Sequence, residues 1–145
     1  MAESSACCSE PCELCEGDGG EVLWKNQLCR IVLVEDPHYP GFCRVILNHH
    51  VREMTDLSPE EACSLMKVVF SVEKAVREVM NPFKINLASF GNMTPHLHWH
   101  VIPRFSEDRH FPNPVWGAVE REGLQYRDPS WREKLKAAVS KIASF

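Results

Sequence analysis

Residues 94–104 run TPHLHWHVIPR and place three histidines, His96, His98 and His100, in strict alternation with apolar residues. Successive side chains of a β-strand point to opposite faces of a sheet, so an alternation of period two predicts a strand. This strand, expected over residues 97–102, carries the histidines on one face and the apolar side chains on the other. Neighbours on one face lie about 7 Å apart along a strand, so one phosphate group can contact two of them.

The rest of the chain supplies four more strands and two helices. Apolar runs bounded by turn residues predict the strands, namely residues 22–24, 28–34, 42–47 and 85–89. Ser58 as N-cap, Pro59 at the first helical position and Glu61 as capping-box partner predict a long helix that ends at Asn81. Asp128 opens a last helix. Five mostly antiparallel strands with one long helix and a C-terminal helix indicate an α+β domain.

The composition is that of an ordinary globular chain. The 145 residues carry a net charge of -4, with 44% hydrophobic and 25% charged residues, so a single packed domain over residues 12–145 is expected. No run of Lys or Arg is long enough to indicate nucleic-acid binding. No apolar run is long enough to span a membrane. Residues 1–11 are acidic and polar, unlike a signal peptide, and we expect them to form a flexible tail.

Seven cysteines are a high and odd number for a chain of this length. Without an export signal they indicate a reducing, cytoplasmic compartment rather than a disulfide framework. Cys12 and Cys15 have the spacing of zinc ligands, although a single C-x-x-C pair also occurs in redox motifs and by chance. Cys7 and Cys8 lie in the expected tail, where we interpret them as free thiols rather than as a ligand pair.

The histidine segment, which ends in Ile-Pro-Arg, resembles the signature of the histidine-triad (HIT) superfamily. That superfamily includes nucleotide-binding phosphoramidases, dinucleoside polyphosphate hydrolases and the galactose-1-phosphate uridylyltransferases. The resemblance extends to residues 40–46 and 48–50 and to the long helix. It covers residues 12–104 and leaves 105–145 as a C-terminal extension. It implies a HIT-like fold, a small-molecule nucleotide substrate, and a homodimer paired through the long helix and a sheet edge.

The resemblance assigns roles to individual residues. The middle histidine of the family attacks the α-phosphorus, which makes His98 the nucleophile, with His100 as proton donor to the phosphate or the leaving group. A neutral imidazole is a good nucleophile near neutral pH, because its unperturbed pKa is about 6.5. Asn92 stands where the family often has a phosphate-contacting Gln. Met93 replaces the usual Ser, and the adjacent Thr94 is the candidate for the missing hydroxyl.

The resemblance also implies a structural zinc site. Some bacterial HIT proteins and the uridylyltransferases hold zinc with a cysteine pair, a histidine before the long helix and the first triad histidine. The matching residues here are Cys12, Cys15, His50 and His96. Two thiolates and two imidazoles form a closed tetrahedral set, which is typical of a structural ion. His49 is an alternative to His50, and the alternative to the whole site is a packed cysteine pair beside a surface histidine.

Several alternatives remain open. Glu35 and Asp36, near the end of the second strand, are either ribose-binding residues or solvated turn charges. Residues 105–126 have no regular pattern, and such a segment covers either the phosphate site or the dimer interface. The three histidines are also compatible with a metal-dependent hydrolase that uses them as ligands. A non-catalytic nucleotide-binding or adaptor module is the other alternative.

Overall fold

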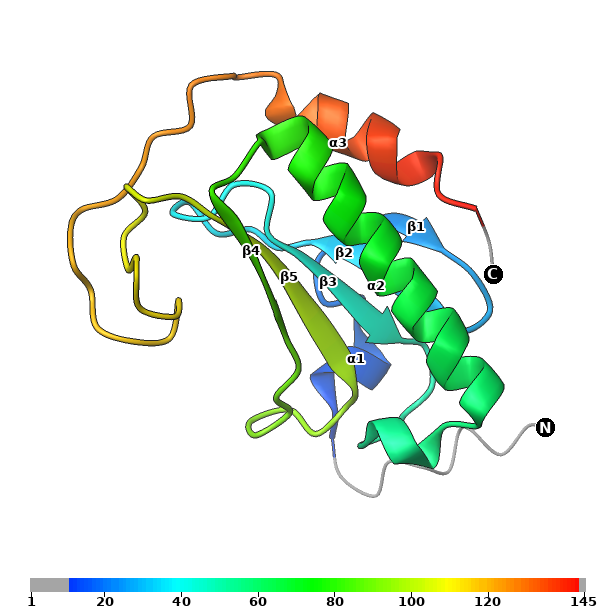
Figure 1. Ribbon diagram of the computed structural model, residues 1–145. Helices are drawn as coiled ribbons and strands as arrows, with labels where there is room; N and C mark the ends of the chain where they lie inside the picture. Colours follow the sequence, from blue (N-terminus) through cyan, green and yellow to red (C-terminus); the bar gives the residue numbers. More distant parts are fainter. Residues whose placement is uncertain (1–10, 144–145) are drawn as a thin grey trace.

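The computed structural model describes residues 11–143, so the expected tail up to residue 10, with Cys7 and Cys8, lies outside the described part. The elements follow one another along the chain as shown in Figure 1. They are α1 (Glu13–Glu16), β1 (Glu21–Lys25), β2 (Cys29–Leu33), β3 (Cys43–Leu47), η2 (Met54–Asp56), α2 (Pro59–Met80), β4 (Lys84–Ala88), β5 (His98–Arg104) and α3 (Trp131–Ser140). All five expected strands and both expected helices are present, and the short α1 and η2 were not anticipated.

The five strands form one antiparallel sheet in the order β1-β2-β3-β5-β4. The histidine strand β5 therefore lies inside the sheet, between β3 and the edge strand β4. In the β3–β5 ladder Ile46 pairs with His98 and Arg44 pairs with His100. An interior strand is held by hydrogen bonds on both sides, so the positions of these side chains are fixed by the ladder.

The long helix α2 begins at the predicted residue because the capping box is formed. The Ser58 hydroxyl accepts a hydrogen bond from the Glu61 N–H at 3.1 Å, and the Glu61 carboxylate accepts one from the Ser58 N–H at 3.0 Å. Asn81 ends the helix in the left-handed conformation, with φ of 50°. The buried side of α2 then lies along its whole length against the sheet, as its 3.6-residue spacing requires.

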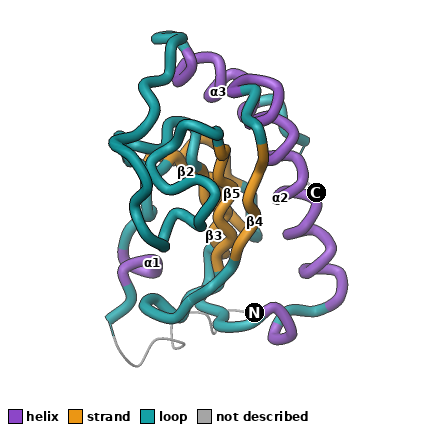
Figure 2. The backbone as a smooth tube through the Cα atoms, turned by 60° about the vertical axis from the view of Figure 1, so that its left-hand side comes forward, coloured by secondary structure: helices purple, strands orange, loops and turns teal. Residues whose placement is uncertain are grey.

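The two faces of the sheet have different coverings. Figure 2 shows α2 on one side of the strands and the long loops on the other. The main core lies on the α2 side and includes Val45, Val101 and the partly buried Trp99. Helix α3 packs on α2 and β1 at the same side. The histidines of β5 alternate with Trp99 and Val101, so they face the side away from α2, as the period-two pattern predicts.

The segment after β5 folds back over the loop side of the sheet and is fixed by one buried ion pair. Arg104 Nε lies 2.8 Å from Asp108 Oδ2, and both side chains are at most 3% exposed. Asp108 also accepts hydrogen bonds from the N–H groups of Phe105, His110 and Phe111. Burial opposes ionisation of Asp108, but the hydrogen bond and charge of Arg104 and the N–H groups of Phe105 and Phe111 outweigh it and lower the pKa of the carboxyl.

No helix within residues 11–143 combines the length and the apolar character that crossing a bilayer requires.

Candidate active site

His98, the first residue of β5, has a fixed tautomer. Its Nδ1 lies 2.6 Å from the carbonyl oxygen of His96. A carbonyl only accepts, so Nδ1 carries the proton and donates, and Nε2 keeps its lone pair. The ring is 8% exposed, and burial lowers the pKa of His98, so the imidazole is neutral near pH 7. A neutral ring with a free Nε2 is the form that attacks an electrophile.

His100 lies beside His98, with 5.0 Å between the ring centroids. The ring is 5% exposed and is surrounded by Phe42 and Trp116, whose centroids are 5.6 and 5.1 Å away. Burial, followed by the nearby charges of His98 and Arg44, lowers the pKa of His100 to about 4. Its Nδ1 is buried and has no hydrogen-bond partner among the residues that the structure describes.

Both rings border a cavity of about 420 Å³. The predicted phosphate-contacting residues Asn92 and Thr94 line the same cavity, on the loop between β4 and β5. The Thr94 hydroxyl lies 3.4 Å from the Glu13 carboxylate and donates to it. The structure thus brings together the two histidines predicted to react and the two residues predicted to hold a phosphate.

The lining also includes residues for which the sequence predicted no role, among them Glu13 on α1, Arg44 on β3 and Trp116 on the C-terminal extension. The signal for Arg44 was present, since it is a single charge inside an apolar strand and alternates onto the same face as the histidines. No local pattern indicates Trp116, because the Arg104–Asp108 ion pair sets the path of its loop. The extension therefore reaches the cavity that His98 and His100 border.

His96 does not border that cavity and belongs to a second group. Its ring is fully buried, and its Nδ1 lies 3.5 Å from both the Cys12 Sγ and the Cys15 Sγ. The Cys15 Sγ is 3.4 Å from the His50 Nδ1, and the four ligand atoms all lie within 4.8 Å of one another. A tetrahedral ion with zinc–sulfur and zinc–nitrogen bonds of ordinary length places sulfur and nitrogen about 3.5 Å apart. The side chains present therefore fit a tetrahedral metal ion.

The other ring nitrogen of His96 supports the same interpretation. His96 Nε2 lies 2.7 Å from the Leu47 carbonyl oxygen, so Nε2 donates and Nδ1 keeps the lone pair that faces the sulfurs. A histidine that ligates a metal is usually oriented in this way by a backbone carbonyl. Of the three histidines, His96 alone belongs to a metal-compatible group in the described part of the chain. This arrangement leaves the hydrolase alternative, with all three as ligands, without support.

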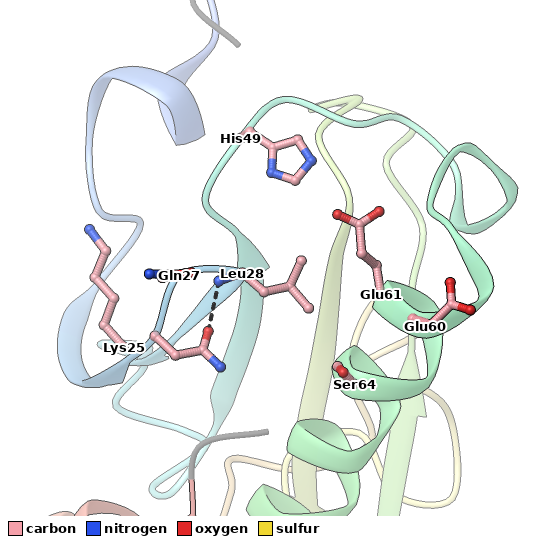
Figure 3. Close-up of a pocket in the computed structure, with 8 residues that line it drawn as sticks. Lys25, Gln27, Leu28, His49, Glu60, Glu61 and Ser64 are labelled. Carbon is pink, nitrogen blue, oxygen red and sulfur yellow. Dashed lines mark hydrogen bonds between the residues drawn. The ribbon is translucent and has the colours of Figure 1, made fainter. Parts of the chain in front are cut away.

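His49, the alternative ligand, points elsewhere. Figure 3 shows it above a separate surface pocket, with Leu28 of the β1–β2 turn and Glu61 of α2 nearby. In this turn Asn26 Oδ1 accepts the Leu28 N–H at 2.9 Å, which is the dashed line in Figure 3. His50, not His49, therefore belongs to the cysteine group.

The two candidate ribose residues lie away from the cavity of His98. Glu35 forms an ion pair with Arg132 of α3, with 2.8 Å between Oε1 and Nη1. Asp36 accepts a hydrogen bond from the His38 N–H at 2.9 Å, as in a turn. Neither residue lines the cavity of His98, so their contact with a ribose stays a prediction.

Comparison with known proteins agrees with this geometry. A sequence model described as "HIT domain" matches residues 19–107. The AP-4-A phosphorylase of Mycobacterium tuberculosis (strain H37Rv) is 29% identical over 105 residues, which are 68% of this chain and 54% of that protein. The asymmetrical bis(5'-nucleosyl)-tetraphosphatase of Schizosaccharomyces pombe is 27% identical over 71% of this chain and 59% of its own length. The chain thus spans somewhat more than half the length of these curated relatives.

Among solved structures, a histidine triad protein from Marinobacter aquaeolei VT8 superposes with a TM-score of 0.69. It is 26% identical, and the match covers 90% of this chain and 92% of that one. The antiparallel sheet with one long helix and a C-terminal helix is therefore shared over nearly the whole of both chains.

Proposed function

The chain belongs to the HIT domain family, and from this membership we propose that it is a nucleotide hydrolase or nucleotidyl transferase acting at the α-phosphorus. The bond broken is a phosphoanhydride or a phosphoramidate. The observation that carries the proposal is the fixed tautomer of His98, whose Nδ1–H is held by the His96 carbonyl and whose Nε2 is left as a nucleophile beside a 420 Å³ cavity.

The reaction has two steps. The Nε2 lone pair of His98 forms a bond to the α-phosphorus, and the bond between phosphorus and the leaving group breaks. The result is a nucleotidyl-histidine. An acceptor, either water or a phosphate, then attacks the same phosphorus, and the P–N bond to His98 breaks. Water gives the nucleoside monophosphate and phosphate gives the diphosphate, with the imidazole restored in both cases.

The other residues of the cavity position the phosphate. The Asn92 amide supplies hydrogen-bond donors to its oxygens, and the Thr94 hydroxyl does the same once it turns away from the Glu13 carboxylate. His100 is neutral in the free protein, because its pKa is about 4, and a bound phosphate raises the pKa of a neighbouring imidazole. In the complex His100 is therefore the proton donor to the phosphate or to the departing group.

The names of two relatives support a class of substrate for this chain. One is an AP-4-A phosphorylase and another a bis(5'-nucleosyl)-tetraphosphatase. These names support a dinucleoside polyphosphate as substrate, with adenosine phosphoramidates as the alternative within the same mechanism. The phosphorylase and the tetraphosphatase differ in acceptor, so products formed with and without added phosphate identify the second step for this chain.

We also propose that Cys12, Cys15, His50 and His96 hold a structural zinc ion. When bound, the ion joins α1 to the segment before β5 and has no part in the chemistry at phosphorus. Thiolate ligands persist in a reducing compartment, which supports a cytoplasmic location. Cell fractionation tests that location, and protein found only outside the cytoplasm would contradict it.

A homodimer is part of the same proposal. Strand β4 is at an edge of the sheet, and Phe83, Leu87 and Phe90 on or beside it are at least 37% exposed. An exposed edge with apolar side chains favours pairing with a second copy. Sedimentation at micromolar concentration tests this, and a species of 16.6 kDa would contradict it.

The decisive experiment is mass spectrometry of protein quenched in base during turnover of diadenosine tetraphosphate. We expect an adenylyl group on His98. His98→Ala should lower kcat by orders of magnitude and leave nucleotide binding in place, whereas His38→Ala, which removes an exposed histidine, should have little effect. Near wild-type turnover by His98→Ala would exclude the mechanism. Tight nucleotide binding without turnover in the wild type would favour the non-catalytic module.

A further inference from the structure

Arg44 is the unexplained charge of the histidine site. It lies on β3, directly paired with His100 in the ladder, and its side chain lines the cavity that His98 and His100 border. The charge is close enough to lower the pKa of both histidines. It is thus the permanent positive charge of this cavity, while the two imidazoles beside it are neutral near pH 7.

The guanidinium has no acceptor among the residues that the structure describes. Its Nε is buried without a hydrogen-bond partner, and the side chain forms no ion pair there. The Phe42 ring, 5.9 Å from Cζ, is its cation–π partner. A half-buried guanidinium without an acceptor is unfavourable, because a charge removed from water needs pairing. A buried donor that no protein group satisfies indicates a ligand of opposite charge.

Glu13 does not fill that role. It is the acidic residue among the described lining of the cavity, and its charge favours the Arg44 guanidinium from a distance, but the two side chains form no hydrogen bond or ion pair. Its carboxylate instead accepts the Thr94 hydroxyl. An anion that enters the cavity therefore finds Arg44 with free donors. The His100 Nδ1, the other buried nitrogen without a partner, lies on the neighbouring strand.

We propose that Arg44 binds the phosphate chain of the substrate next to the α-phosphate and so selects nucleoside polyphosphates over phosphoramidates. This inference rests on the proposed function of the same site. His98 must meet the α-phosphorus, and its ladder partner is Ile46. Arg44 is paired two residues further along, with His100, on the same face of the sheet, so its donors are placed to meet the phosphate next to the α-phosphate. A polyphosphate leaving group carries negative charge to that position, whereas the leaving amine of a phosphoramidate does not.

The first test is a binding titration, which needs no turnover. AMP, ADP and ATP are titrated calorimetrically into the wild type, Arg44→Met and Arg44→Lys. In the wild type we expect affinity to rise with each added phosphate. Arg44→Met should weaken the binding of ATP by about 10- to 100-fold, as expected for the loss of a charge-assisted contact, and the binding of AMP by much less. Arg44→Lys keeps the charge, so its affinity for ATP should lie between those of the wild type and Arg44→Met. A uniform loss for all three nucleotides, or none, would overturn the proposal.

The second test separates this inference from the function on which it rests. For Arg44→Met, kcat/KM for diadenosine tetraphosphate should fall at least about tenfold more than kcat/KM for adenosine 5'-phosphoramidate. Retained phosphoramidate turnover shows that His98 still reacts. Equal losses on both substrates would overturn the role of Arg44 and leave the histidine mechanism standing. A wild type that turns over neither substrate would reject the function, and the titration would still decide whether Arg44 binds phosphate.

The controls address charge and folding. Arg77→Met removes the same charge from an exposed position on α2, the helix that covers the other face of the sheet, and should leave every nucleotide affinity unchanged. Arg44→Met should fold at least as well as the wild type, because it removes an unpaired, half-buried charge. A large fall in Tm for both Arg44→Met and Arg44→Lys would instead show that Arg44 holds the sheet together, and would contradict a role in binding.

Discussion

Replacing Asp108 by alanine should loosen the C-terminal extension and destabilise the whole domain. The change removes both carboxylate contacts to Arg104, at 2.8 and 3.1 Å, and leaves a guanidinium that is 2% exposed without a counter-charge. It also removes the acceptor of the Phe105, His110 and Phe111 N–H groups. Breaking a buried ion pair from one side costs about 3–5 kcal/mol of the free energy of unfolding. Total stability is about 5–15 kcal/mol, so the loss is large.

Urea unfolding, followed by far-UV circular dichroism, measures this loss. Asp108→Asn keeps an acceptor oxygen without the charge, so its free energy of unfolding should fall by less than that of Asp108→Ala, by about 1.5–3 kcal/mol. Glu107→Ala is the matched control, since it removes the adjacent exposed carboxylate, which accepts a hydrogen bond from the Ser106 hydroxyl, and should change stability by less than about 0.5 kcal/mol. The loop also carries Trp116 to His100, so kcat should fall in Asp108→Ala. A loss below 1 kcal/mol, the scale of an ordinary surface contact, would refute the reasoning.

Two further perturbations test the metal-compatible group and the buried histidine. Cys12→Ser or His50→Ala should abolish stoichiometric zinc, as measured by elemental analysis, and should lower Tm. His49→Ala, the adjacent control, should retain the metal. Stoichiometric zinc in all three variants would exclude the site. The pKa of His100 is lowered to about 4 in the folded protein, below the ordinary value of about 6.5. The contribution of the neutral imidazole to the free energy of unfolding is therefore complete above about pH 6.5, and up to about 3 kcal/mol of it is lost as pH falls toward 4. Unfolding by urea at pH 7 and pH 5 should show a smaller pH dependence in His100→Asn, and an unchanged dependence would contradict the burial argument.

Local signals were sufficient for most of the fold. The capping box at Ser58 and Glu61 fixed the start of α2, because its hydrogen bonds involve residues only three apart. The alternation of histidines with Leu97 and Trp99 was sufficient for β5 and for the face that each side chain occupies. Strand bounds moved by one or two residues, since ladder ends depend on the partner strand. The short helix α1 was missed because four residues carry no periodic signal.

Long-range contacts account for what the sequence did not predict in the site. Arg44 meets the histidines only because β3 pairs with β5, and Trp116 reaches His100 only because Asp108 holds Arg104. These contacts join residues far apart in the chain, and no local pattern encodes them. The family resemblance predicted which residues react, but it did not predict the charges around them. Arg44 and Glu13 are those charges, and we expect the substrate preference to depend on them.

The short helix α1 connects the two sites. Glu13 lies between Cys12 and Cys15, so the same short segment that carries the two thiols also places a carboxylate at the cavity of His98. The Thr94 hydroxyl donates a hydrogen bond to that carboxylate, and His96, two residues later, contacts the thiols. Both ends of the connection are therefore tied to the same short segment before β5. A ligand set that fixes α1 also fixes the negative charge that shares a cavity with Arg44, and through it the electrostatic field that an incoming phosphate meets. We therefore expect loss of a metal ion from the group of Cys12, Cys15, His50 and His96 to change substrate affinity as well as stability, without any contact between that ion and the reacting phosphorus.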